Sequence, residues 1–332
     1  MNAPMYTISA KAIDLVAQIA EKLGEIRGAG EYSRNLRLRR INRLRSIQSS
    51  LAIENNMLSL GQVTNIIEGK RVLGQPHEIQ EVKNAYQTYE YLLGYDPYKV
   101  KDFLKAHRFM TTDLVKDAGR FRSQGVGVFA GTQFIHAGAN YQFVPQLITD
   151  LFTWAKKTDI HPLIKSSIVH FEIEFIHPFM DGNGRIGRLW QTLILSKWNE
   201  LFAWLPVETV VYENQQGYYD ALEKSEKTAN SEVFIEFMLN AVLQALEELP
   251  NREITDIFTD INTDKLSKTE LEFLEQITGY LDKNGEITNY RAQLLTNKSD
   301  ISVKKYFARF VKIGLLQIEG KNKGRKYIIN KK

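Results

Sequence analysis

Cysteine is absent from this sequence, and only 8 of its 332 residues are proline. The chain therefore has no disulfide, no thiol nucleophile and no cysteine-ligated zinc, which fits a reducing compartment. Scarce proline favours long helices, because proline interrupts helical hydrogen bonds. Long hydrophobic runs are also missing, so we expect neither a signal peptide at 1–23 nor a membrane-spanning helix. These absences predict a soluble cytoplasmic protein.

Charge is distributed unevenly along the chain. Residues 265–332 carry 15 Lys and Arg against 7 Asp and Glu, whereas the preceding 264 residues carry 28 against 32. A shift of this kind marks a domain boundary, and the polar segment 251–264 is the predicted linker. We expect a helical N-terminal region at 1–95, a second domain at 96–250 and a small basic domain at 265–332.

Hydrophobic residues recur at helical spacing through most of the first 250 residues, so this part is predicted to be mainly α. The exception is 125–144, where apolar residues lie among glycines, a pattern typical of a β-hairpin. The predicted helices span 7–26, 33–56, 59–68, 77–93, 98–111, 145–156, 162–175, 184–199, 215–227 and 232–249.

Six arginines lie between Arg34 and Arg45. Such a run can bind nucleic acid, but the first 264 residues carry no basic surplus. We therefore interpret the arginines as a solvent-exposed helix face beside acidic neighbours.

The basic domain is predicted to be a small α+β winged helix-turn-helix. Helices are expected at 267–280, 287–295 and 302–313, and strands at 315–319 and 326–329. The third helix would present four basic side chains, and the turn at 321–325 would form the wing. Because no dense basic stripe with base-reading Asn or Gln stands out, we favour protein docking or a homodimer over nucleic acid. The four side chains are Lys304, Lys305, Arg309 and Lys312.

The segment from His177 to Arg188 has the backbone features of an anion site. Pro178 ends the preceding helix, and Gly182 and Gly184 permit conformations that a side chain would block. A new helix beginning near Gly184 would direct its first N–H groups into the loop. The alternative is a polar turn between two helices, but so many specified residue types at fixed spacing argue against chance.

Charged side chains of the same segment suit a nucleotide. Arg185 and Arg188 lie on one side of the new helix, and guanidinium groups match phosphate oxygens. Asp181 offers the carboxylate that Mg²⁺ bridging phosphates requires. His177 can take a proton from a hydroxyl near neutral pH.

A metal site is the alternative use of His177 together with His170 and Glu174, which share a helical spacing. We do not favour it, because Pro178 ends that helix and no zinc-protease pattern is present.

The segment 177–188 resembles the signature His-Pro-Phe-x-Asp-Gly-Asn-Gly-Arg-x-x-Arg of the Fic (Fido) family, with every specified position filled. Members of that family are mostly helical enzymes that transfer AMP from ATP to a hydroxyl side chain of a target protein. The resemblance implies a protein adenylyltransferase with a catalytic domain at 96–250, ATP as co-substrate and Mg²⁺ as cofactor. The target protein is unknown, and the enzyme itself is one candidate.

The resemblance also implies roles for single residues. His177 would deprotonate the target hydroxyl, Asp181 would hold Mg²⁺ on the α and β phosphates, and Phe179 would anchor the loop in the core. The helix N-terminus would cradle the α phosphate, and two arginines would grip the β and γ phosphates. The implied nucleotide-binding residues of this segment are Asp181, Gly182, Asn183, Gly184, Arg185, Ile186, Gly187 and Arg188.

A second stretch, Ser50 to Asn55, is similar to the inhibitory motif Ser/Thr-x-x-x-Glu-Gly/Asn of the same family. A carboxylate that reaches into an anion site has a natural partner in a phosphate-binding arginine. Glu54 paired with Arg188 would take the place of the γ phosphate and misalign ATP. The predicted inhibitory residues are Ser50, Glu54 and Asn55.

Two weaker similarities complete the comparison with the family. Residues 125–136 resemble the flap that aligns a target segment by strand addition, and we favour this interpretation over a hairpin that faces the core. Tyr218 and Tyr219 resemble the tyrosine pair that encloses adenine, although they also suit an ordinary core. Glu226 stands where an asparagine would contact the base, which leaves the nucleotide preference open.

The sequence is therefore compatible with three functions. The leading hypothesis is an adenylyltransferase that Glu54 inhibits. The alternatives are a DNA-binding regulator whose body only senses a nucleotide, and removal of AMP or transfer of another nucleotide by the same site.

Overall fold

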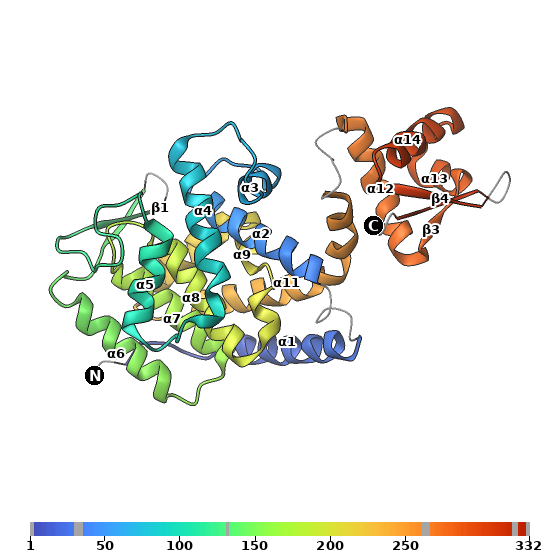
Figure 1. Ribbon diagram of the computed structural model, residues 1–332. Coiled ribbons are helices and arrows are strands. Elements are labelled where there is room, and N and C mark those ends of the chain that lie inside the picture. Colours follow the sequence, from blue (N-terminus) through green and yellow to red (C-terminus); the bar gives the residue numbers. More distant parts are fainter. Residues whose placement is uncertain (1–2, 30–35, 131–132, 260–265, 321–324, 330–332) are drawn as a thin grey trace. The chain divides into compact units, whose positions relative to one another are not determined.

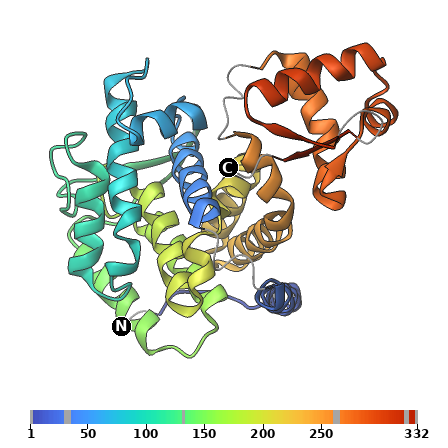
Figure 2. The ribbon, with the colours of Figure 1, turned by 45° about the vertical axis from the view of Figure 1, so that its right-hand side comes forward.

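The computed structural model describes residues 3–29, 36–130, 133–259, 266–320 and 325–329. The chain divides into two compact units, residues 1–246 and 247–332. Figures 1 and 2 show that helices make up most of the first unit, with one short hairpin. The predicted mainly α fold is confirmed.

The elements of the first unit follow the predicted order. Helix α11 begins in this unit and continues into the next one. Strands β1 (Gly127–Ala130) and β2 (Gln133–Ala137) form an antiparallel hairpin. The helices are α1 (Ala10–Ala29), α2 (Leu36–Ile53), α3 (Leu60–Ile67), α4 (Pro76–Glu90), α5 (Val100–Thr111), α6 (Val144–Lys157), α7 (Pro162–Ile176), α8 (Asn183–Trp198), α9 (Val207–Glu213), α10 (Gln215–Thr228) and α11 (Glu232–Thr259).

Helices α7 and α8 form the centre of the first unit. Both are buried along almost their whole length, α8 including several polar and charged side chains. Trp190 of α8 is fully buried, and its ring packs against Phe103 of α5 and Phe152 of α6 at centroid distances of 5.0 and 5.9 Å. Its indole N–H donates to the carbonyl of Pro97 at 2.9 Å. The loop between α7 and α8 therefore starts and ends on rigidly packed helices.

Helix α2 lies within the core, and the prediction of a solvent-exposed arginine face is wrong for Arg43. This side chain is 4% exposed, and its guanidinium lies over the rings of Trp204 and Tyr89, at 4.6 and 5.4 Å from their centroids. Burial lowers the pKa of Arg43. A guanidinium that lies over aromatic faces keeps part of its electrostatic stabilisation after it leaves water. Hydrophobic periodicity alone does not reveal that an arginine is buried in this way.

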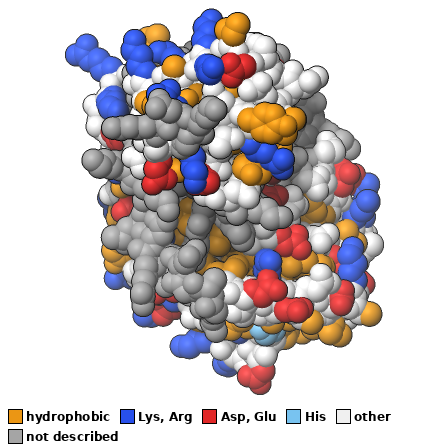
Figure 3. All heavy atoms as spheres, turned by 90° about the vertical axis from the view of Figure 1, so that its right-hand side faces the viewer, with side chains coloured by type: hydrophobic (Ala, Val, Ile, Leu, Met, Phe, Trp, Pro, Cys, Tyr) orange, Lys and Arg blue, Asp and Glu red, His pale blue; other side chains and the backbone are white. Residues whose placement is uncertain are grey.

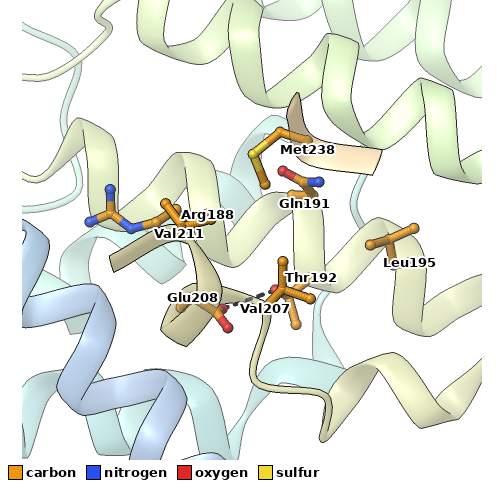
Figure 4. Close-up of a pocket in the computed structure, with 8 residues that line it drawn as sticks. All are labelled: Arg188, Gln191, Thr192, Leu195, Val207, Glu208, Val211 and Met238. Carbon is orange, nitrogen blue, oxygen red and sulfur yellow. Dashed lines mark hydrogen bonds between the residues drawn. The ribbon is translucent and has the colours of Figure 1, made fainter. Parts of the chain in front are cut away.

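Helix α9, which the sequence analysis did not predict, carries a buried carboxylate that joins three other helices. Glu208 is 2% exposed and accepts hydrogen bonds from Ser46 of α2 at 2.8 Å, Tyr89 of α4 at 2.9 Å and Thr192 of α8 at 3.1 Å. Figure 4 shows Glu208 bonded to Thr192 at the wall of a small cavity next to α8. Because its donors lie on α2, α4 and α8, Glu208 links α2 to the centre of the fold.

The second unit contains helices α12 (Lys268–Asn284), α13 (Asn289–Thr296) and α14 (Asp300–Lys312). Its antiparallel sheet has the order β3-β5-β4, formed by β3 (Glu286–Ile287), β5 (Lys326–Ile329) and β4 (Leu316–Glu319). Phe273, Phe307 and Phe310 are fully buried between these elements. The three predicted helices and two predicted strands are present, and β3 is additional.

The predicted linker 251–264 is wrong in its first part, because α11 continues to Thr259. The segment 251–259 contains neither glycine nor proline, and Ile254, Ile257 and Phe258 keep helical spacing. Its polar composition concealed that periodicity. Residues 260–264 of this linker, and 321–324 of the predicted wing, lie outside the described residues.

The predicted basic helix of the tail is α14, on which Lys304, Lys305 and Lys312 are exposed. Lys304 pairs with Asp300 of the same helix at 2.6 Å. On the face drawn in Figure 3, many of the Lys and Arg side chains of the described residues gather near the upper edge, with hydrophobic side chains between them. Among the described helices, none has the length and apolar character needed to cross a membrane.

The hydrogen bonds of Glu208 predict a large effect of its removal. We expect Glu208→Ala to lower the free energy of unfolding of the first unit by about 2–4 kcal/mol, because three buried hydroxyl groups lose their acceptor. All 4 tryptophans lie in the first unit, so urea unfolding followed by their fluorescence measures this unit alone. Glu213→Ala, at an exposed position of the same helix, is the control and should change it by less than about 0.5 kcal/mol. Equal losses in the two variants would contradict the assigned role.

Candidate active site

The loop between α7 and α8 is held in a conformation that few residues adopt. His177 ends α7 with a φ of 52°, and Gly182 precedes α8 with a φ of 82°. A Cβ atom at Gly182 would lie 2.9 Å from Cγ2 of Thr111, so a side chain is excluded there by space as well as by conformation. These two turns place all residues between them at the N-terminal end of α8.

Phe179 and Asn183 fix the inside of this loop. The Phe179 ring is fully buried and stacks on the imidazole of His107, with centroids 3.6 Å apart. The Phe179 N–H donates to Oδ1 of Asn183, and Nδ2 of Asn183 donates to the Phe179 carbonyl, both at 2.9 Å. The Asn183 side chain, which the resemblance places at the α phosphate, is thus bonded to the loop backbone in this structure.

His107 of α5 also supports this loop, through a hydrogen bond to its backbone. The sequence alone did not point to this residue. Its Nδ1 accepts from the N–H of Gly119 at 2.9 Å, so its proton is assigned to Nε2, which donates to the Asp181 carbonyl at 3.0 Å. Burial lowers the pKa of His107 to about 4, which keeps the ring neutral. The signal for it was slight: a polar residue at a buried position of an amphipathic helix.

Arg122 is a second supporting residue that was missed. It is 3% exposed, and its Nε donates to the His177 carbonyl at 2.6 Å. Its other nitrogens donate to carbonyls before and after the β1–β2 hairpin, those of Gln124 and Ala139. A Cβ atom at Gly138 would lie 3.2 Å from Cβ of His177. The hairpin predicted as a flap therefore begins and ends beside His177, although residues 131–132 lie outside the described residues.

The predicted ion pair between Glu54 and Arg188 is present. Nη2 of Arg188 lies 2.7 Å from Oε1 of Glu54 and 2.9 Å from the carbonyl of Ser50, and Nε donates to the Ser50 hydroxyl at 3.1 Å. Only 2% of the Arg188 side chain is exposed. Burial alone would lower the pKa of Arg188, but the carboxylate of Glu54 outweighs it, and the pKa is raised.

Glu54 reaches the N-terminus of α8 because α2 stops immediately before it. Asn55 has a φ of 67°, its N–H bonds to the Ala52 carbonyl, and the Asn56 N–H bonds to the Leu51 carbonyl. This is a Schellman ending, which glycine or asparagine adopts most readily. The ending explains physically why asparagine follows the glutamate of the predicted inhibitory motif.

The Glu54 carboxylate lies against the first turn of α8. A Cβ atom at Gly184 would overlap with Oε1 of Glu54, so the absence of a side chain at Gly184 permits this approach. The N-terminus of a helix carries a partial positive charge and unpaired N–H groups. An anion therefore already occupies the place that the sequence assigns to phosphate.

Arg185 is held by two carboxylates. Its Nη1 donates to Oε1 of Glu81 at 3.0 Å, and its Nη2 lies 3.2 and 3.1 Å from the two oxygens of Asp181. The Arg185 side chain is 3% exposed, whereas 55% of the Asp181 side chain is exposed. Glu81, on α4, was not found by sequence analysis because it is 104 positions away from its partner.

Asp181 fits a magnesium ion that is bound mainly by nucleotide phosphates and water. Mg²⁺ commonly takes one or two protein carboxylates together with substrate phosphates, and half of this carboxylate is open to solvent. Among the described residues, no group of three His, Asp or Glu side chains could hold a metal ion by itself. The alternative site at His170 is not supported, since its ring nitrogens contact Gln191 at 2.6 Å and Tyr218 at 3.1 Å.

Helix α10 places the two predicted adenine-binding tyrosines differently. Tyr218 is 1% exposed and contacts His170, as a core residue does. Tyr219 is half-buried, and its hydroxyl donates to the Ile53 carbonyl at 3.2 Å, which also accepts from Gln215 at 2.9 Å. The helix that would meet the base therefore also holds the last residue of α2.

Comparison with known proteins agrees with this geometry. A family model described as the Fic/DOC family matches residues 97–195. The crystal structure of a Fic family protein from Desulfovibrio desulfuricans G20 matches with 38% sequence identity and a TM-score of 0.74, covering 100% of this chain and 99% of that one. The chain belongs to the Fic family.

More distant Fic proteins match only in part. The protein adenylyltransferase fic-1 of Caenorhabditis elegans is 31% identical over 176 residues, which are 49% of this chain and 34% of that protein. The structure of Fic-1 residues 134–508 from C. elegans has a TM-score of 0.59 at 21% identity and covers 75% of this chain and 74% of that one, a likeness of fold. This chain spans about a third of the length of the curated relative.

The neutral His107 predicts how the stability of this Fic fold depends on pH. Its pKa is about 4 in the folded state and about 6.5 when unfolded, so the unfolded chain binds more protons between these values. The contribution of the neutral His107 ring to the free energy of unfolding is complete above about pH 6.5, and it is lost as the pH falls towards 4. Between pH 7 and 4.5, wild type should lose about 2–3 kcal/mol more than His107→Gln, whose amide does not titrate. Urea unfolding monitored by tryptophan fluorescence measures this, and parallel pH profiles would refute it.

Proposed function

We propose that this Fic protein is a protein adenylyltransferase, which transfers AMP from ATP to a hydroxyl side chain of a protein, and that Glu54 inhibits it in the conformation described. The observation that carries the proposal is the Glu54 carboxylate bound to Arg188 at the N-terminus of α8. A site in which a buried arginine faces the N-terminus of a helix is suited to bind an anion. Curated relatives that are named protein adenylyltransferases support the same class of reaction.

His177 is the proposed general base. Its Nδ1 lies 3.3 Å from the Glu174 carbonyl, which accepts a hydrogen bond from the Nδ1–H group and leaves Nε2 as the basic nitrogen. In the reaction, Nε2 takes the proton of the target hydroxyl while the hydroxyl oxygen forms a bond to the α phosphorus. The bond from that phosphorus to the bridging oxygen breaks, and pyrophosphate leaves with the electron pair. The product is an AMP ester of the target side chain.

The remaining residues bind and orient the triphosphate. The first turn of α8 and Arg188 would neutralise its negative charge, which is the main requirement of phosphoryl chemistry. Asp181 and the phosphates would hold Mg²⁺, whose charge assists departure of the pyrophosphate when it is bound. Asn183, His107 and Arg122 contribute by fixing the loop that carries these groups.

Inhibition follows from the place that Glu54 occupies. As long as its carboxylate pairs with Arg188, a phosphate meets a like charge and lacks its guanidinium partner. A nucleotide that binds beside Glu54 is displaced from alignment with His177, and a displacement of about 1 Å costs on the order of a hundredfold in rate.

The proposal predicts that Glu54→Gly activates the enzyme. Incubated with ATP labelled in the α phosphate and with Mg²⁺, this variant should label itself or a lysate protein on the order of a hundredfold faster than wild type. His177→Ala in the same background should abolish labelling. The measurement is radioactivity in protein bands over time.

Glu68→Gly provides a matched control. Glu68 also ends a helix, α3, and pairs with a basic residue, Lys70 at 2.6 Å. It should leave labelling at the wild-type rate. If Glu54→Gly matches wild type while His177→Ala still abolishes labelling, inhibition by Glu54 is wrong and transfer stands. If no variant labels any protein with the labelled ATP, the proposed transfer is wrong.

A further inference from the structure

Glu54 is not the only carboxylate that links the end of the inhibitory segment to the nucleotide loop. Glu81 of α4 is mostly buried, with 16% of its side chain exposed. Its Oε1 accepts from Arg185 at 3.0 Å, and its Oε2 accepts from Nδ2 of Asn56 at 2.8 Å. Each oxygen therefore has its own partner, one in the nucleotide loop and one two residues after Glu54.

The contact continues from Arg185 to Asp181. The second guanidinium nitrogen of Arg185 binds both Asp181 oxygens at 3.1–3.2 Å, and only 3% of the Arg185 side chain is exposed. One buried positive charge is thus shared by two carboxylates. The Arg185 guanidinium attracts Asp181 less strongly when Glu81 neutralises part of the same positive charge.

We propose that Glu81 is a positioning residue that sets the metal dependence of nucleotide binding, by holding Arg185 and thereby leaving Asp181 able to bind a divalent cation. The inference rests on the nucleotide site proposed above. Without the charge of Glu81, Arg185 is paired with Asp181 alone, and a carboxylate neutralised by a guanidinium is a poorer ligand for Mg²⁺. Outer partners of this kind typically change metal affinity by about 10–100-fold.

The bond to Asn56 gives Glu81 a second consequence. Because Glu81 contacts both the segment after Glu54 and Arg185, the proposed role of Glu81 would couple the position of that segment to the affinity of Asp181 for a cation. Such coupling is reciprocal, so a bound cation also biases the position of the segment.

Glu78 offers a matched control on the same helix, one turn earlier. Its Oε1 accepts from the N–H of Met57 at 2.7 Å, and its Oε2 accepts from the N–H of Gln75 at 3.3 Å. Glu78 thus also holds the chain that follows Glu54, but through contacts that do not involve Arg185. Replacing Glu78 tests whether the loss of any carboxylate from this part of α4 weakens Mg-ATP binding in the same way.

The experiment uses the full chain with Glu54→Gly, in which the phosphate place is open. Isothermal titration calorimetry measures the Kd of ATP with Mg²⁺ and, separately, with EDTA. Added to this background, Glu81→Gln should weaken Mg-ATP binding about tenfold and change metal-free ATP binding by less than about twofold. Glu78→Gln should leave the ratio of the two Kd values unchanged.

The ratio separates positioning from general damage. Equal weakening with and without Mg²⁺, or an unchanged ratio in Glu81→Gln, would overturn the role of Glu81. Glu81→Asp keeps the charge at a shorter reach and should lose about threefold, again only with Mg²⁺; it carries the test should Glu81→Gln lose its cooperative thermal unfolding. If even the Glu54→Gly protein binds ATP in neither buffer, the proposed nucleotide site itself fails.

Discussion

A guanidinium that is removed from water requires an anion, and Arg188 places that requirement at the centre of this fold. With 2% of its side chain exposed, it cannot be left unpaired without a cost of several kcal/mol. In the described conformation Glu54 meets the requirement, and in the proposed reaction a phosphate would meet it. Glu54 and a phosphate would therefore compete for the positive charge of Arg188, and this competition alone would make the two states mutually exclusive.

Three buried polar side chains act on the loop between α7 and α8 rather than on a ligand. His107, Arg122 and Asn183 all bond to main-chain atoms of the loop between α7 and α8. They hold left-handed turns that an isolated chain would rarely adopt. The groups proposed for chemistry, His177 and Asp181, are accordingly left with side chains that reach solvent, on a backbone that cannot relax.

The sequence predicted what is local and missed what is distant. The segment from His177 to Arg188 is contiguous, so its glycines, charges and helix start could be interpreted together. Glu81 and Glu208 act on partners more than 100 positions away, and nothing in their own surroundings in the sequence marks them. Arg43 was misplaced for a related reason, because periodicity treats every arginine as polar surface, whereas aromatic rings from other elements can cover one.

The left-handed turn at Asn55 fixes the residue at which α2 ends. Successive residues of a helix are rotated by about 100°, so a helix that ended one residue earlier or later would swing the carboxylate well away from its arginine. Lengthening or shortening α2 by a single residue would therefore turn the Glu54 side chain by about 100° around the helix axis. In the proposed mechanism, a binding partner would not have to pull α2 out of the core, because unwinding or extending its last turn would be enough to separate Glu54 from Arg188.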